Sequence, residues 1–120
     1  NSNNKLNKIK KIFNNYDLFA SFGEQNSKGV ITLLAKHLNY QLLDQQYDID
    51  GRYVKLKIKI NNEIFNIINI YAPTDSREQI YFIDNIYSLF NKLNEQYILA
   101  GDSMLLLTLK LIPLIIKEQL

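Results

Sequence analysis

The clearest pattern in the chain is a strict alternation of apolar and polar side chains between residues 52 and 60. Even positions hold the apolar residues Val54, Leu56, Ile58 and Ile60, and lysines fill most of the odd positions. Because successive side chains of a β-strand point to opposite faces, this period of two predicts a strand with one face in a core.

A second strand is predicted directly after this one. The pair Asn61-Asn62 suits the positive φ angles of a tight hairpin turn. Residues 64–72 are apolar on nearly both faces, as in an interior strand, and Pro73 ends the run because it lacks an amide hydrogen. This hairpin places Arg52 opposite Tyr71 on the core-facing side, at the end of the two strands.

Shorter patterns predict the remaining elements. Apolar residues at helical spacing indicate an amphipathic helix over residues 6–13, and apolar runs indicate strands at 16–22, 30–34, 40–43 and 97–100. Asp75 and Glu78 are spaced as a capping box at the start of a second helix. Its predicted buried stripe is Ile80, Ile83, Tyr87, Phe90 and Leu93. The order strand, helix, strand indicates an α/β arrangement.

Residues 104–120 differ from the rest, since they are nearly all Leu and Ile, broken by Lys110 and Pro113. A membrane span needs about 20 apolar residues, so this charged, shorter run predicts no membrane segment. We therefore divide the chain into a partial domain at 1–103 and an atypical apolar tail at 104–120.

Composition narrows the chemistry only slightly. The chain has 120 residues, which is one domain or part of one, and its net charge of +2 does not by itself imply a nucleic-acid partner. The absence of cysteine from the sequence excludes disulfides and thiolate chemistry, and it favours a reducing, intracellular compartment.

Candidate functional residues gather where the predicted strands end. Arg52, Asn69 and Tyr71 cluster at one end of the hairpin, where a guanidinium and a phenol could bind a phosphate. Alternatively, Arg52 forms a salt bridge with Asp48 or Asp50 while Tyr71 caps the core. Both interpretations remain open on spacing alone.

Three further features are open to two interpretations each. Asp102 follows a buried strand and a glycine, so it could bind a divalent cation or orient a water, or it could simply form a turn. His37, the one histidine of the sequence, is expected at the surface, and a catalytic role is its alternative. A stripe of lysines at positions 55, 57 and 59 is expected to be solvated, although it could touch a phosphate backbone.

Four segments, read together, resemble the endonuclease/exonuclease/phosphatase superfamily, in the branch carried by LINE-type non-LTR retrotransposons. They are Asn-Ser-Lys-Gly-Val at 26–30, Asp-Gly-Arg-Tyr at 50–53, Asn-Ile-Tyr-Ala-Pro at 69–73 and Ala-Gly-Asp at 100–102. Their order and spacing agree with that family over about residues 15 to 102. Its relatives include abasic-site endonucleases, pancreatic-type DNases and inositol-phosphate phosphatases.

The resemblance implies an α/β (α+β) fold: a partial two-sheet β-sandwich flanked by helices, of the DNase I-like kind. It also implies Mg²⁺- or Mn²⁺-dependent cleavage of DNA, with the nucleus as a place of action. Tyr71 would contact the scissile phosphate, and Asp102 would orient the attacking water or hold metal. Arg52, Asn69 and Thr74 would support phosphate binding.

The departures from the family pattern are equally specific. Met104 stands where the family has an asparagine, and Thr74 stands where an asparagine is common. The family's metal-binding Glu has no counterpart upstream, and neither Asp nor His follows Asp102 in this sequence. We therefore expect the N-terminal half of a retrotransposon-type endonuclease domain that is catalytically incomplete and whose binding of metal is doubtful.

Two alternatives remain: a non-catalytic nucleic-acid-binding module, and a fragment of a small-substrate phosphatase of the same superfamily. We also expect non-specific self-association, because half of a two-sheet sandwich would leave the inner face of a single sheet uncovered.

Overall fold

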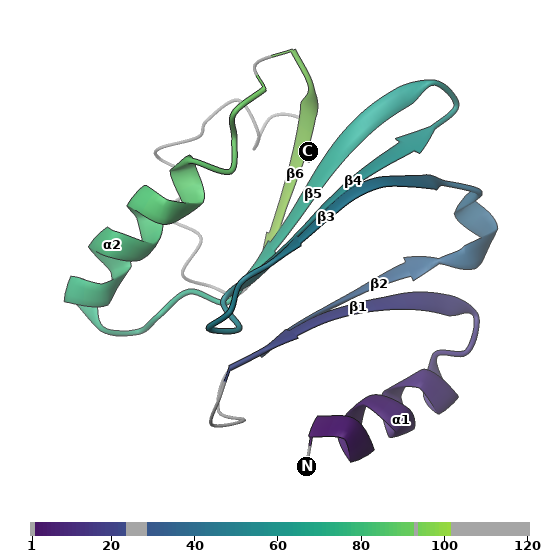
Figure 1. Ribbon diagram of the computed structural model, residues 1–120, viewed down its shortest axis with the longest axis horizontal. Helices are drawn as coiled ribbons and strands as arrows, with labels where there is room; N and C mark the ends of the chain where they lie inside the picture. The colour runs from purple at the N-terminus through teal and green to yellow at the C-terminus, as the bar shows by residue number, and fades with distance from the viewer. Residues whose placement is uncertain (1, 24–28, 93, 102–120) are drawn as a thin grey trace.

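The computed structural model describes residues 2–23, 29–92 and 94–101, and Figure 1 shows its arrangement. The elements in chain order are α1 (Ser2–Ile12), β1 (Tyr16–Phe22), β2 (Gly29–Ala35), the 3-10 helix η1 (Lys36–Leu38), β3 (Gln41–Tyr47), β4 (Tyr53–Ile60), β5 (Glu63–Ile70), α2 (Ser76–Tyr87) and β6 (Gln96–Gly101). The tail at 104–120 lies outside the described residues.

The strands form two sheets. Strands β1 and β2 make an antiparallel pair, and the larger sheet has the order β3-β4-β5-β6. Strands β3, β4 and β5 are antiparallel, whereas β6 runs parallel to β5 after the α2 crossover. Figure 1 shows four layers in the order α1, small sheet, large sheet, α2. The expected partial two-sheet sandwich flanked by helices is confirmed.

The β4–β5 hairpin has the predicted register. Asn61 and Asn62 both take positive φ angles, of 50° and 66°, as a tight hairpin turn requires. Val54 pairs with Asn69, and Tyr53 pairs with Ile70. The alternating sequence therefore predicted which residues face each other across this hairpin.

The core between the two sheets is built on the alternating strand. Val54, Leu56 and Ile58 are at most 2% exposed and pack with Val30 and Leu34 of β2. The expectation of a single sheet with an uncovered inner face is therefore wrong, because the β1–β2 hairpin covers the middle of that face. Its short apolar strands gave too little signal to show that they form a second layer.

The outer face of the large sheet packs against α2, but mostly not through the predicted stripe. Of that stripe, Phe90 packs against this core from beyond the helix, and Leu93 lies outside the described residues. Helix α2 buries Phe82 and Ile86, whereas Ile80 is 65% and Tyr87 58% exposed. Two apolar stripes run along this helix, and the one that contains Phe82 faces Ile68, Ile70 and Leu99 of the sheet. Apolar spacing alone could not choose between them. No helix in the described part of the chain is long and apolar enough to cross a membrane.

Candidate phosphate-binding corner

The start of β4 and the ends of β5 and β6 lie side by side at one end of the large sheet. The β4–β5 pairing continues one residue beyond the strands, because the Tyr71 N–H donates to the Arg52 carbonyl at 2.7 Å. On the other side of β5, Ile70 pairs with Gly101 of the parallel strand β6. Arg52, Tyr71 and the end of β6 therefore lie side by side, and Asp102 follows Gly101 outside the described residues.

Gly101 allows β6 to approach β5 closely. Its φ is +153°, and an added Cβ would lie 2.5 Å from the Ile70 carbonyl oxygen. A side chain at this position would therefore push the two strand ends apart. The close packing of β6 on β5 therefore explains the glycine of the Gly-Asp pair without any appeal to catalysis.

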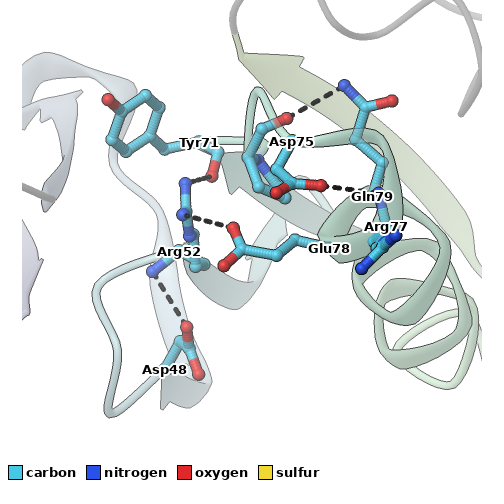
Figure 2. A network of polar contacts seen from close by, with 8 residues as sticks. Asp48, Arg52, Tyr71, Asp75, Arg77, Glu78 and Gln79 are labelled. Carbon is cyan, nitrogen blue, oxygen red and sulfur yellow. Dashed lines mark hydrogen bonds and ion pairs between the residues drawn. The ribbon is translucent and has the colours of Figure 1, made fainter.

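Arg52 lies at the centre of this corner, and Figure 2 shows its contacts. One guanidinium nitrogen donates to the Tyr71 carbonyl oxygen at 3.2 Å, and another lies 3.9 Å from the Glu78 carboxylate. The guanidinium carbon is 5.2 Å from the centroid of the Tyr71 ring, a cation–π distance. The side chain is only 14% exposed, so these contacts replace the water that its charge would otherwise need.

The structure departs from the sequence prediction in the direction of the Arg52 side chain and in its ion-pair partner. It neighbours Tyr71 as predicted, but it precedes the regular part of β4, so its guanidinium turns towards α2 and leaves the core-facing phase. A salt bridge with Asp48 or Asp50 was the alternative. Instead, the carboxylate of Asp48 accepts from the Arg52 backbone N–H at 2.9 Å, and the ion pair forms with Glu78.

The turn before Arg52 fastens the two sheets together at this end. The Gly51 N–H donates to the Asp48 carbonyl, and Gly51 has a φ of +74°. A Cβ on Gly51 would lie 2.4 Å from the Gly23 nitrogen, so only glycine fits against the end of β1. The Ser21 hydroxyl also donates to the Asp48 carbonyl oxygen. The Asp-Gly-Arg segment is therefore a docking point between the sheets.

Asn69 lies apart from the guanidinium, within the core between the sheets. Its amide donates to the Ile31 carbonyl at 3.1 Å and lies 3.2 Å from the Thr32 hydroxyl, both in β2. Through these bonds Asn69 connects β5 of the large sheet to β2 of the small sheet. Its predicted role in phosphate binding remains a prediction.

The segment that follows Tyr71 leads into α2. Thr74 is exposed, and Asp75 caps the helix by accepting from the Arg77 N–H at 2.8 Å. The Gln79 amide donates to the Pro73 carbonyl at 3.0 Å (Figure 2). The cap at Asp75 is confirmed, but the side chain of Glu78 pairs with Arg52. The sequence pattern had assigned it to the capping box.

An open cavity of about 230 Å³ lies between α2 and the turn that precedes Arg52. Its polar lining includes Asp48, Asp50, Arg52 and Glu78, and Tyr81 and Phe82 supply apolar walls. Among the described residues, however, no group of three or more His, Cys, Asp or Glu side chains is placed to hold a metal ion. Asp48 and Glu78 are engaged with the backbone and side chain of Arg52 instead.

The lysine stripe of β4 is not the solvated face that the sequence predicted. The Lys55 ammonium donates to the Leu89 carbonyl at 2.6 Å, and Lys57 pairs with Glu95 at 2.9 Å. Burial lowers the pKa of Lys55 below its ordinary value. The chain that follows α2 folds back over this face. The spacing of residues within β4 could not predict a contact with residues so far away in the sequence. His37, by contrast, is exposed on η1 as expected.

Comparison with known proteins places this geometry in context. A solved structure of truncated TDP2 from Caenorhabditis elegans superposes with a TM-score of 0.55 and 14% identity, over 81% of this chain and 44% of that one. The chain has a DNase I-like fold. The resemblance at the level of fold, inferred from four short motifs, is thereby confirmed.

Sequence comparison finds similarity to a transposon protein. The chain is 28% identical over 78 residues to the transposon TX1 uncharacterized 149 kDa protein of Xenopus laevis. That match covers 63% of this chain and 6% of the Xenopus protein, so the chain spans a small part of its relative. A search of protein-family models found no match.

Proposed function

We propose that this chain is part of a retrotransposon-type DNA endonuclease domain, and that on its own it does not cleave DNA. One observation carries the proposal: the strand pairing sets Tyr71 beside the end of β6, from which Asp102 follows. Ligands of open α/β sheets bind beyond the carboxyl ends of such strands. The similarity to a transposon protein supports the retrotransposon branch over a small-substrate phosphatase.

Tyr71 is the residue best placed to contact a phosphate. Arg52 binds its carbonyl oxygen and lies near its ring, which restrains the side chain. In Figure 2 the phenol oxygen lies at the far end of the ring from Arg52. We infer that Tyr71 donates one hydrogen bond to phosphate while Arg52 positions it.

The described residues do not provide a site for Mg²⁺ or Mn²⁺. The carboxylates of Asp48 and Glu78 are already bound by Arg52. We therefore assign only Asp102 a role in holding metal or orienting water, and we derive no step from it. Met104 adds to the expected inactivity, because a thioether is a poor ligand for Mg²⁺.

A rival function, nucleic-acid binding through the lysine stripe without cleavage, loses support from the geometry. Lys55 and Lys57 are each engaged by the chain that follows α2. Two of the three stripe lysines would have to break these contacts before they reached a phosphate backbone.

Nicking of supercoiled plasmid tests the proposal. Purified chain and Asp102→Ala should give the same background in Mg²⁺ or Mn²⁺, because a catalytic set that acts as a unit fails together. Metal-dependent nicking by the wild-type chain that disappears in the variant would contradict the claim of inactivity.

A further inference from the structure

A second candidate binding site lies at the end of the small sheet that is farther from the Arg52 corner. The corner docks on the Phe22 end of β1 through Gly51 and Gly23, whereas Tyr16 pairs with Ala35 at the other end. Seven strand residues separate the two ends by about 20 Å. Figure 1 shows α1 beside this distant end, outside the small sheet.

A groove of about 540 Å³ opens there between α1 and β1. Its volume lies within the roughly 300–1,000 Å³ typical of ligand clefts. Lys10 and Lys36 reach it from two different elements, and Asn14 and Tyr16 add further lining. The groove therefore combines positive charge, hydrogen-bonding groups and an aromatic ring.

The charges around this groove are unbalanced. Lys8, Lys10, Lys11 and Lys36 are all exposed. Within the described ranges, none of their ammonium groups forms an ion pair. One carboxylate, that of Asp17, also lines the groove, and it accepts a hydrogen bond from Tyr40 at 2.6 Å. Among the lining residues, two unpaired lysines against one carboxylate leave the groove with a net positive charge.

Aromatic rings accompany these charges. Phe13 and Tyr16 form an edge-to-face pair with centroids 5.8 Å apart, yet they remain 39% and 42% exposed. Exposed aromatic rings next to lysines are the usual platform for unpaired bases, because bases stack on the rings while lysines neutralise the phosphates.

We propose that the groove between α1 and β1 binds single-stranded nucleic acid, with Lys10 and Lys36 on phosphates and Tyr16 stacked on a base. This site is distinct from the corner at Arg52, and its argument does not rest on the proposed endonuclease ancestry. A membrane surface fits less well, because two of the three apolar residues of α1, Leu6 and Ile9, are half-buried, and Ile12 alone is exposed, at 72%.

The test measures fluorescence anisotropy of labelled oligodeoxythymidylate of about 12 nucleotides in a salt titration. Lys10→Gln and Lys36→Gln should each reduce the slope of log affinity against log salt by about 0.7, the value for one lost phosphate contact on a single strand. Tyr16→Leu should weaken binding about tenfold at constant salt, because a stacked ring is lost.

Lys92→Gln is the matched control, since Lys92 is exposed beyond α2 and loses the same charge. An unchanged slope in Lys92→Gln, with reduced slopes in the two groove variants, supports the site. Equal effects of all three lysine variants would overturn it, because they would reflect net charge alone. Binding to phosphatidylserine vesicles without binding to the oligonucleotide would also overturn it.

Discussion

Arg52 illustrates how one side chain joins parts of the chain that are far apart in sequence. It contacts Tyr71 at the end of β5 and Glu78 in α2, while its backbone N–H is bound by Asp48. Because the guanidinium is nearly buried and makes these contacts without a ligand, it stabilises the arrangement of the corner in the free chain. Its charge is already matched by Glu78, which is why we treat it as a positioning group.

Replacing Arg52 should therefore reduce stability. Arg52→Met leaves the part-buried Tyr71 carbonyl without its donor, at a cost of about 1–3 kcal/mol, whereas the Glu78 carboxylate, 62% exposed, is solvated by water. Urea denaturation should show this loss, and Arg77→Met, at an exposed position in α2, should cost less than about 0.5 kcal/mol. Equal stability of the two variants would contradict the role given to Arg52.

At the scale of single elements, the strands were easier to predict than α2. The alternation in β4 and the turn at Asn61-Asn62 are local signals, so register followed from the sequence. Helix α2 carries apolar residues on two sides, and only the position of the sheet decides that Phe82 and Ile86 are buried. The direction of the Arg52 side chain was predicted wrongly for a similar reason, because the alternation of a strand does not determine the direction of a residue that precedes it.

The orientation of α2 can be tested by matched truncations. Ile86 is 1% exposed and Ile80 65% exposed. Ile86→Ala should therefore cost about 2–4 kcal/mol and Ile80→Ala less than about 0.5 kcal/mol. Chemical denaturation monitored by circular dichroism would measure both. A larger loss for Ile80→Ala would restore the originally predicted stripe.

The segment between α2 and β6 covers the lysines of β4, and this predicts a dependence on pH. Hydrogen bonds from Lys57 and Asn66 lower the pKa of Glu95 in the folded chain. A folded-state pKa below the unfolded value means that Glu95 stabilises the fold above its ordinary pKa. That contribution disappears as the pH falls through the lowered value.

Denaturation at pH 7 and pH 3 (conditions chosen to bracket the ordinary glutamate pKa of about 4.3) would measure this effect. Glu95→Gln should be less stable than wild type at the higher pH, and the difference should be smaller at the lower one. Glu63→Gln, at the exposed first residue of β5, provides the control. A constant difference between Glu95→Gln and wild type would argue against this coupling.

At the scale of the whole molecule, the small sheet covers only part of the inner face. Ile98 of β6 pairs with Ile67 on that face and is 38% exposed. We predicted such an open apolar surface from the sequence. That prediction supposed that no second sheet covers the inner face, so it overstated the exposed apolar area. The position of the β1–β2 hairpin depends on contacts such as that of Asn69 with β2, which no local pattern encodes.

The expected self-association is thereby assigned to the β6 side of the molecule. Sedimentation velocity should show an average mass that rises with concentration, and Ile98→Lys should reduce it, because a charge opposes burial of this face. Tyr87→Lys, which places the same charge on the exposed side of α2, is the control. A monomer at all concentrations would refute the prediction.

The order β3-β4-β5-β6 also has a consequence for how quickly the chain folds. In the described part of the chain, every strand pairs only with its neighbours in sequence. The antiparallel pairs are joined by short connections that close at little entropic cost, whereas the β5–β6 pair must wait for the α2 crossover. Each antiparallel strand can therefore pair as soon as it follows its predecessor, which would let β3, β4 and β5 form structure during synthesis, before β6 is available.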